Sequence, residues 1–214
     1  MGADKVFLPL AGKPLLAWSV DVCQDCDLLS QIVVVLNGSK LDEGRILVAE
    51  RGWSMMAVCA GGERRQDSVR QGLKELRRCD WVVVHDGARP FLTVDLIRDG
   101  LEAARETGAA TAAVPVKDTI KLADDNQMVR ETLERQRLWA VQTPQVFRFD
   151  IITRAHAQTT ADVTDDGALV ERLGYKVKIY LGSYENIKIT TPQDLALAEV
   201  IVKDRQARAS WNRL

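Results

Sequence analysis

The chain has 214 residues, of which 46% are hydrophobic and 28% charged, and its formal net charge at pH 7 is −1. That length is enough for one domain with a substantial buried core. The near-neutral charge argues against a partner such as nucleic acid or an anionic membrane. No apolar run approaches the roughly 20 residues of a membrane span, and the N-terminus lacks a basic-then-apolar signal peptide. We therefore expect a cytoplasmic protein.

Short apolar runs alternate with helical patterns over the first 116 residues. The predicted strands are residues 32–36, 55–59, 81–85 and 110–116, and the predicted helices are residues 14–26, 41–51, 67–77 and 94–107. This βαβα order predicts a mostly parallel sheet with helices on both faces. The runs of Val and Ile do not alternate with polar residues, which is typical of a sheet buried on both sides.

The pattern changes after residue 116. Residues 119–122 and 128–129 flank the polar turn 124–126, which predicts a β-hairpin. We expect a projecting arm over residues 117–140 that contacts a second subunit.

The last part of the chain returns to helices and short strands. The predicted elements are a helix at 165–173 with Thr164 as its N-cap, strands at 175–180 and 187–190, a helix at 192–203 with Thr191 as its N-cap, and a frayed polar tail from Asp204. The sequence contains no repeat or linker, so residues 1–214 are predicted to form a single domain.

Two polar clusters directly follow predicted strands, where open α/β sheets bind their ligands. In residues 61–68 the glycines permit a close backbone approach and the following helix N-terminus suits an anion. In residues 85–91, Asp86 suits a metal ion or a sugar hydroxyl, and Arg89 suits a phosphate. The alternatives are a plain turn with a helix cap in the first cluster and a local Asp–Arg pair in the second.

Lys188 lies inside the apolar run 187–189, where a lysine either extends to water or faces an anion. His85 and His156 are the chain's two histidines, and no Ser-His-Asp or Cys-His arrangement is indicated. Cations combined with glycine turns are typical of phosphate handling, in which positioning and charge neutralisation supply most of the catalysis.

Seven segments in a fixed order resemble one enzyme family, the 2-C-methyl-D-erythritol 4-phosphate cytidylyltransferases of non-mevalonate isoprenoid synthesis. The matching segments are residues 4–10, 61–69, 85–91, 118–119, 135–147, 164–166 and 186–190. The resemblance implies a Rossmann-like nucleotidyltransferase sheet with a projecting hairpin arm. It also implies a Mg²⁺-dependent homodimer that transfers CMP from CTP to a polyol phosphate, 2-C-methyl-D-erythritol 4-phosphate, and releases pyrophosphate.

The resemblance further implies roles for individual residues, some of which would act from the neighbouring subunit. The implied catalytic residues are Lys5, Arg135 and Lys188. The implied CTP-binding residues are Lys5, Gly62, Glu63, Ser68, Asp86 and Lys188, with Asp86 also near the metal ion. The implied substrate-binding residues are Asp86, Arg89, Thr119, Arg135, Thr164 and Thr190.

The chain departs from the family at its beginning. Family members open with an apolar strand and a loop of the form A-A-G-x-G-x-R, whereas residues 1–5 stand where that loop ends. In the family's strand order, the lost strand lies between residues 32–36 and 81–85, so we expect a slot there. Each large apolar side chain that is lost removes about 1.5–3 kcal/mol of stabilising burial energy. The net free energy of unfolding of a domain is about 5–15 kcal/mol, so the loss of a few such side chains can exceed it.

We hypothesise that the chain has been trimmed, or that an internal Met has been read as the start of the gene. Either truncation would impair the function of this chain. The codons upstream of Met1 decide it: an in-frame glycine-rich loop ending in Arg supports the hypothesis, and a nearby stop codon refutes it.

Two other functions stay open at this point. One is the similar ribitol 5-phosphate cytidylyltransferase family, which has a related His-Asp-x-x-Arg-Pro segment. The other is a non-catalytic nucleotide-binding or dimerising module, which the missing loop favours.

Overall fold

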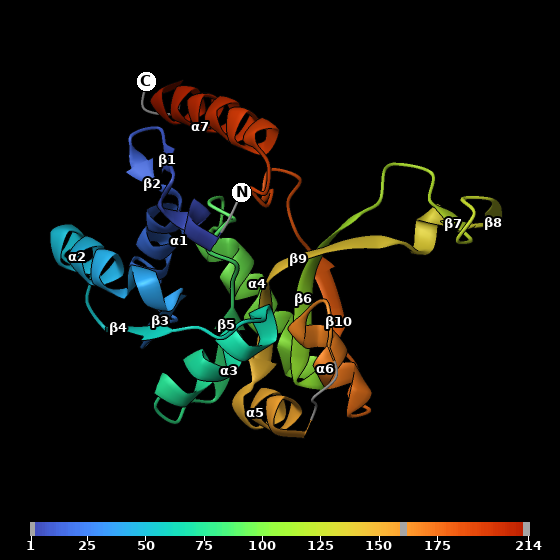
Figure 1. Ribbon diagram of the computed structural model, residues 1–214, viewed down its shortest axis with the longest axis horizontal. Coiled ribbons are helices and arrows are strands. Elements are labelled where there is room, and N and C mark those ends of the chain that lie inside the picture. The colour runs from blue at the N-terminus through green and yellow to red at the C-terminus, as the bar shows by residue number, and fades with distance from the viewer. Residues whose placement is uncertain (1–2, 159–161, 212–214) are drawn as a thin grey trace.

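The computed structural model describes residues 3–158 and 162–211, which form an α/β architecture with helices on both faces of the strands (Figure 1). The helices are α1 (Leu15–Gln24), α2 (Leu41–Arg51), α3 (Arg65–Glu75), α4 (Val94–Thr107), α5 (Phe149–Gln158), α6 (Asp166–Arg172) and α7 (Pro192–Trp211). The strands are β1 (Pro9–Leu10), β2 (Lys13–Pro14), β3 (Ile32–Leu36), β4 (Met56–Ala60), β5 (Trp81–Val84), β6 (Ala109–Pro115), β7 (Lys121–Ala123), β8 (Val129–Thr132), β9 (Trp139–Arg148) and β10 (Lys178–Leu181). Three short 3-10 helices are η1 (Ala3–Phe7), η2 (Gly38–Lys40) and η3 (Arg135–Arg137).

The main sheet has four strands in the order β10-β6-β9-β5, and β3 and β4 form a separate parallel pair. Strand β10 is parallel to β6, whereas β9 runs antiparallel to both of its neighbours, β5 and β6. The predicted α/β class is confirmed, and β9 is the strand that departs from the mostly parallel arrangement.

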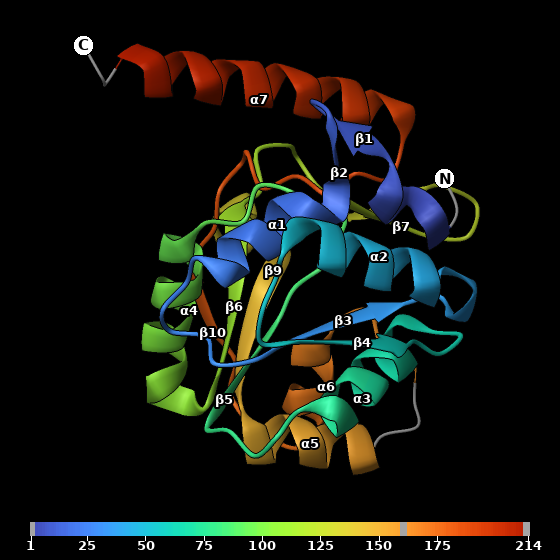
Figure 2. The same ribbon diagram turned by 90° about the vertical axis from the view of Figure 1, so that its left-hand side faces the viewer.

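Helices cover both faces of the strands and close two main apolar cores. Figure 2 shows α1 and α2 on one side of β3 and α3 on the other. Buried side chains of α4 pack with those of β6, β9 and β10 in one core, and α3, α5 and α6 pack against the opposite face in the other. Among the described residues, no helix combines the length and apolar character that crossing a membrane requires.

A gap in the hydrogen-bonded strands separates β3 from β5. The two strands belong to different sheets, and a cavity of about 370 Å³ is lined by residues of both. This is the place at which the sequence predicts a slot. The cavity opens between α1 and α3, which also contribute side chains to its lining.

Helix α4 illustrates how local chemistry sets the boundaries that the sequence predicts. The side chain of Thr93 accepts a hydrogen bond from the backbone N–H of Leu96 and so caps the first turn. Leu96, Ile97 and Ala104 are buried on one face, as helical spacing requires. Gly108 ends the helix in the left-handed conformation, with φ of 83°. The bounds of α2 and α4 coincide with the predicted ranges.

Three predictions for the last part of the chain are wrong. Residues 187–190 do not form a strand, although the N–H of Ile189 donates to the carbonyl of Ala88. The N-cap of α6 is Asp165 rather than Thr164, because the Asp165 carboxylate accepts from the N–H of Ala168. Helix α7 continues past the predicted tail to Trp211, because Arg205 pairs with Glu185 and covers the ring of Phe91.

The sequence analysis also missed β9 and α5. Strand β9 contains Pro144, which cannot donate a ladder hydrogen bond and therefore argues against a central strand. The register between β6 and β9 shifts between Thr111 and Ala113, and Pro144 lies on the β9 side of this irregularity. Because the ladder pairing is interrupted at this irregularity, no backbone N–H donor is needed at Pro144.

The predicted hairpin is present. Strands β7 and β8 pair in antiparallel fashion and project away from the rest of the molecule (Figure 1). Apolar side chains on and beside the hairpin are exposed: Leu122, Met128 and Val129. The role of this arm as a dimer contact stays a prediction.

Candidate active site

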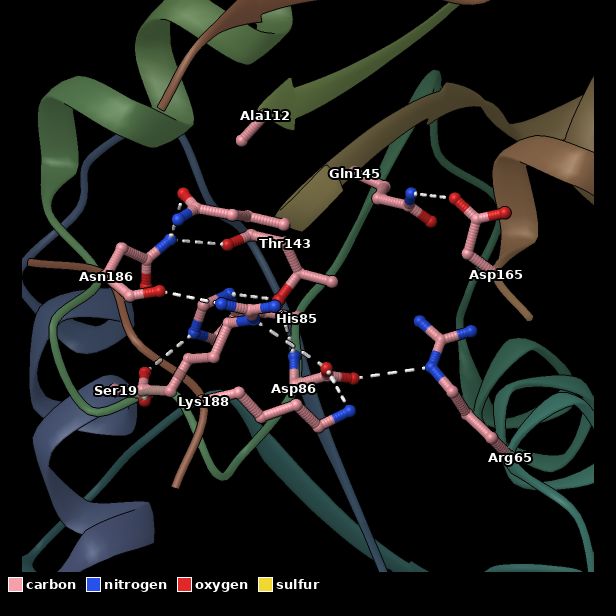
Figure 3. A network of polar contacts seen from close by, with 12 residues as sticks. Ser19, Arg65, His85, Asp86, Ala112, Thr143, Gln145, Asp165, Asn186 and Lys188 are labelled. Carbon is pink, nitrogen blue, oxygen red and sulfur yellow. Dashed lines mark hydrogen bonds and ion pairs between the residues drawn. The ribbon is translucent and has the colours of Figure 1, made fainter. Parts of the chain in front are cut away.

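The site is built around the carboxylate of Asp86, which follows the carboxyl end of β5. Lys188 Nζ lies 2.8 Å from its Oδ2, Arg65 Nε lies 3.3 Å from its Oδ1, and Arg89 Nε lies 3.8 Å from its Oδ2. Figure 3 shows the Lys188 and Arg65 side chains reaching Asp86 from opposite sides. The carboxylate of Asp86 thus gathers three cations, and Asp165 and Asp166 place two further carboxyl groups beside them.

The neighbouring cations keep Asp86 ionised. Burial would by itself raise the pKa of this carboxyl group. The hydrogen bond from Lys188 and the charges of Arg65, Lys188 and Arg89 outweigh burial and lower the pKa to about 2. Asp86 is therefore a fixed negative charge throughout the physiological pH range.

A chain of hydrogen bonds holds the backbone of Asp86. Its N–H donates to Thr143 Oγ1 over 3.0 Å, and that hydroxyl is 3.1 Å from His85 Nδ1. His85 Nε2 lies 3.0 Å from the carbonyl oxygen of Arg89, which also accepts from Ser19 Oγ. Because a carbonyl can only accept, Nε2 carries the proton of the neutral ring, and Nδ1 accepts from the hydroxyl of Thr143.

Arg89 is oriented by the loop that carries Lys188. Its Nη1 donates over 2.7 Å to the carbonyl of Asn186, and the Asn186 amide donates over 2.8 Å to the carbonyl of Thr143. Asn186 is fully buried. The Nε of Arg89 is buried and has no hydrogen-bond partner among the described residues. Its nearest charged neighbour is Asp86, whose Oδ2 lies 3.8 Å away, so this N–H is held toward that carboxylate.

Arg65, the first residue of α3, is shared between two carboxylates. Its Nη1 donates over 2.6 Å to Asp166, and Asp166 in turn is 2.9 Å from His156 Nε2. Asp166 and His156 are both buried. Burial disfavours the charged form of Arg65, but Asp166 and Asp86 outweigh it and raise the pKa. Arg65 thus links α5 and α6 to the central carboxylate.

Residues 61–68 form the turn that begins α3. Ser68 Oγ accepts from the N–H of Gly62 over 3.2 Å. A Cβ at Gly62 would clash with the Cβ of Asp67, so glycine is required for the loop to pack on the helix. Glu63 is exposed beside this turn.

Lys5, in η1, lies in the electrostatic field of the same cluster. Burial lowers its pKa, and the positive charge of Lys188 lowers it further, while Asp86 and Asp194 oppose the shift. Asp194 accepts hydrogen bonds from the backbone and hydroxyl of Thr190 at the start of α7. Lys5 therefore senses the charges of Lys188, Asp86 and Asp194, and its role in the site stays a prediction.

A cavity of about 290 Å³ adjoins the cluster. Its lining includes four predicted site residues: Asp86, Arg89, Thr164 and Lys188. Thr119 and Arg135 do not line it, because they belong to the arm region, where Arg135 donates to the carbonyl of Lys117. Within one chain, the structure does not bring the predicted arm residues to the cavity.

The sequence reasoning missed the residues that support the charged groups. These are Arg65, Thr143, Gln145, His156, Asp166 and Asn186. Arg65, Thr143, Gln145, Asp166 and Asn186 lie inside segments that carried the family resemblance, so position in those segments was the available signal. His156 had none.

The donor set fits a metal ion that arrives with a ligand. No group of three or more His, Cys, Asp or Glu side chains among the described residues could hold a metal by itself. Asp86 is one ionised carboxylate on the lining of a cavity that Arg65, Arg89 and Lys188 also line, and Mg²⁺ is commonly held by one or two carboxylates together with substrate phosphates.

Comparisons with known proteins agree on one family. A family model described as IspD: 2-C-methyl-D-erythritol 4-phosphate cytidylyltransferase matches residues 1–204. A protein with that enzyme name from Dehalococcoides mccartyi strain CBDB1 is 49% identical over 203 residues, which are 94% of this chain and 89% of the relative. Another, from Pelotomaculum thermopropionicum, is 47% identical over 216 residues, covering 97% of this chain and 91% of the relative.

Solved structures give the same answer. The 4-diphosphocytidyl-2C-methyl-D-erythritol synthase of Anaerococcus prevotii matches with a TM-score of 0.86 and 30% identity, covering 91% of this chain and 88% of that chain. The 2-C-methyl-D-erythritol 4-phosphate cytidylyltransferase of Thermus thermophilus matches with a TM-score of 0.80 and 33% identity, covering 94% of this chain and 95% of that chain.

The buried ring of His85 predicts a specific loss of stability in mild acid. Burial lowers its pKa from 6.5 to about 4, so between these values the unfolded chain binds more protons than the folded chain. The free energy of unfolding should therefore fall as pH drops from 6.5 to 4, by up to about 1.4 kcal/mol per pH unit. The contribution of Asp86 to the free energy of unfolding is lost at lower pH, as the pH falls from 3.8 to about 2.

Urea unfolding of the wild type and of His85→Gln at several pH values between 4 and 7 measures this effect. The variant should show a shallower dependence on pH. Equal slopes for the two proteins would show that His85 is not the group responsible.

Proposed function

Because this chain belongs to the 2-C-methyl-D-erythritol 4-phosphate cytidylyltransferase family, we propose that the cation cluster around Asp86 is where it transfers its cytidylyl group. As a member of the family the chain is a cytidylyltransferase, which moves CMP from CTP to 2-C-methyl-D-erythritol 4-phosphate and releases pyrophosphate. The observation that supports the location is one ionised carboxylate held by Arg65, Arg89 and Lys188 beside a cavity of about 290 Å³.

The chemistry requires two anions to meet. A phosphate oxygen of the polyol substrate attacks the α-phosphorus of CTP, a new P–O bond forms, and the α–β bridging P–O bond breaks in line with it. The electron pair of that bond leaves with pyrophosphate. Fixed cations must offset the repulsion between the two polyanions before attack is possible.

We assign that charge neutralisation to the chain's own cations. We assign Lys5 and Lys188 to the CTP phosphates, because Lys188 contacts the Asp86 carboxylate and Lys5 lies in the electrostatic field of both. We assign Arg89 to the polyol phosphate, because Arg89 and Thr164 line the same cavity. The turn at Gly62, Glu63 and Ser68 is assigned to the cytosine and ribose.

Asp86 is proposed to have two tasks. Its ionised oxygens can accept hydrogen bonds from sugar hydroxyls, and one of them can bind Mg²⁺ that enters with CTP. When bound, that ion would neutralise phosphate charge beyond what the side chains provide. Arg65 touches no reacting atom in this assignment and acts by fixing the orientation of Asp86.

The arm is proposed to complete the site of a second copy of the chain. Thr119 and Arg135 are assigned to the polyol phosphate and catalysis, yet they lie outside the cavity of their own chain. The projecting hairpin with its exposed Leu122, Met128 and Val129 supports a homodimer in which each arm reaches the neighbouring subunit. The four free cysteines are consistent with the proposed cytoplasmic location.

Substrate choice tests the proposed reaction. Pyrophosphate release from CTP should require 2-C-methyl-D-erythritol 4-phosphate and should be at least about tenfold slower with ribitol 5-phosphate, because the site must fit one polyol. Equal or faster release with ribitol 5-phosphate would support the related polyol enzyme. Tight CTP binding by titration calorimetry without turnover of either polyol would support a non-catalytic module.

Two adjacent arginines provide a matched test of the positioning role. Arg65→Gln removes both ion pairs that hold Asp86 and Asp166, so kcat/KM should fall about 10- to 100-fold. Arg64→Gln removes a more exposed pair with Asp67 and should change kcat/KM less than about twofold.

The kinetics of the two variants are compared with their unfolding midpoints. A positioning role predicts that Arg65→Gln lowers kcat more than its stability loss can explain, and that Arg65→Lys recovers part of the rate. Equal kinetics for Arg64→Gln and Arg65→Gln would remove Arg65 from the site.

The arm predicts a concentration-dependent dimer. Sedimentation of the wild type should give twice the 23.8 kDa chain mass, and Met128→Asp with Val129→Asp should shift the protein toward the single-chain mass. Ile46→Asp changes a similarly exposed apolar residue on α2, away from the arm, and should leave the dimer intact. A wild type that sediments as a single chain at tens of micromolar would contradict the proposal.

A further inference from the structure

The arm (residues 117–140) leaves the domain where the main sheet narrows. Strands β6 and β9 are still paired at Pro115 and Trp139, whereas the neighbouring strand β10 already ends at Leu181, which pairs with Ala113. Beyond Pro115 the arm continues as a two-stranded ribbon (Figure 1). Such ribbons vary more in twist than wide sheets and are only marginally stable alone, so backbone pairing by itself leaves the direction of the arm loosely defined.

The side chain of Tyr184, in the turn that follows β10, holds the base of the arm. Its hydroxyl donates over 2.7 Å to the carbonyl oxygen of Pro115, and Lys117 Nζ lies 3.7 Å from the centroid of its ring, as a cation–π contact. Among the described residues, and apart from the backbone pairing that continues β6 and β9, no other hydrogen bond, ion pair or cation–π contact joins the arm to the rest of the chain.

The ring of Tyr184 packs at the base of the arm rather than in the apolar interior. Tyr184 is 48% exposed, whereas Tyr180, four residues earlier on β10, is buried in a core with α4. The contacts to Pro115 and Lys117 therefore account for where this ring lies.

The same contact continues to Arg135. Arg135 Nη1 donates over 2.9 Å to the carbonyl oxygen of Lys117, whose side chain lies on the ring of Tyr184. Thr119 follows Lys117 closely in the same strand of the arm. A change in the direction of the arm at its base therefore moves Lys117, Thr119 and Arg135 together.

The turn that carries Tyr184 is itself firmly held. The buried Gln142 of β9 donates over 2.9 Å to the carbonyl oxygen of Ser183 and accepts from the N–H of Ser183 over 3.3 Å. The N–H of Gly182 donates over 2.8 Å to the carbonyl oxygen of Ala113. Tyr184 thus extends from a turn that is fixed to both β6 and β9, and it can act as a rigid support for the arm.

We propose that Tyr184 is a positioning residue that fixes the direction of the arm and thereby places Arg135 in the site of the second copy. This inference rests on the proposed function, in which Arg135 acts on the polyol phosphate of the neighbouring subunit. Tyr184 touches no reacting atom. Its effect on the rate is indirect, because a displacement of a catalytic group by about 1 Å can cost about 100-fold in rate.

Steady-state kinetics of two substitutions test the role. Tyr184→Leu removes the hydroxyl and the ring, and Tyr184→Phe removes the hydroxyl alone. Tyr184→Leu should raise KM for the polyol phosphate at least about fivefold and leave KM for CTP within about twofold, because Arg135 is assigned to the polyol phosphate. Tyr184→Phe should fall between the wild type and Tyr184→Leu, and Arg135→Ala should show the same selectivity with a larger effect.

Tyr175 supplies a matched control. Its ring also has a cationic neighbour, with Arg154 Cζ 6.0 Å from the centroid, but it packs with the core of α5 and α6 rather than with the arm. Tyr175→Phe should change both KM values less than about twofold. Sedimentation and unfolding midpoints are measured for every variant, and Tyr184→Leu should sediment like the wild type.

Mixed dimers test whether Tyr184 acts across the subunit boundary. A Lys188→Gln chain has a damaged site and an intact arm, whereas a Tyr184→Leu chain has an intact site and a misdirected arm. The two chains carry different affinity tags, are produced together and are purified through both tags. One site in each mixed dimer then combines an intact site with an intact arm, so kcat/KM for the polyol phosphate should return to about half the wild-type value.

A parallel mixed dimer of Arg135→Ala and Lys188→Gln separates this inference from the proposed function. If that pair recovers activity and the Tyr184→Leu pair does not, Tyr184 does not act through the arm and the inference alone is wrong. If neither pair recovers, the arm does not complete the second site, and the proposed role of the arm fails together with the inference.

The kinetic results can also overturn the positioning role. An unchanged KM for the polyol phosphate in Tyr184→Leu contradicts it directly. An equal rise of KM for CTP and for the polyol phosphate would show a general structural defect. Sedimentation of Tyr184→Leu as a single chain would show that Tyr184 serves assembly instead of the placement of Arg135.

Discussion

The ionised carboxylate of Asp86 is the group on which the arrangement of the site depends. A buried charge is stable only when it is paired and hydrogen-bonded. Here Lys188 and Arg65 contact it directly, and Arg89 lies slightly farther away. Each partner comes from a different segment of the chain, so satisfying one carboxylate brings three cations to the end of one strand. A phosphate that enters this place therefore meets several fixed cations at once.

The supports of these groups extend far from the carboxylate itself. Arg65 is held by Asp166, which is held by His156, so α3, α5 and α6 share one buried polar network. On the other side, Asn186 links the loop of Lys188 to β9 through the carbonyl of Thr143. Removing any one member leaves a buried polar group without its partner, which costs more than the net contribution of a satisfied hydrogen bond. The network therefore couples site geometry to the packing of helices that touch no ligand.

Sequence patterns predicted the elements whose chemistry is local. The strands at 32–36 and 81–84 are recognisable as valine runs, and α4 is bounded by Thr93 and Gly108, which act through their own neighbours. Strand β9 was missed because Pro144 is unfavourable in a ladder unless an irregularity in the pairing with β6 accommodates it, which is a tertiary effect. The contacts of Arg65 were not predictable from local pattern, since they are made with two carboxylates, 21 and 101 residues away in sequence. Asp86, Arg89 and Lys188 were accessible because polar residues at strand ends stand out in sequence.

The division of the strands into two sheets has a consequence for how the domain transmits motion. A continuous sheet is stiff because backbone hydrogen bonds join every strand to the next. Between β3 and β5 that continuity is replaced by side-chain contacts, with Gln31 and Arg77 at one end and Arg65 and Asp86 at the other. The Arg65–Asp86 pair therefore serves as both a site contact and a mechanical link. Site geometry and the packing of α3 beside β5 are therefore coupled at this pair of side chains.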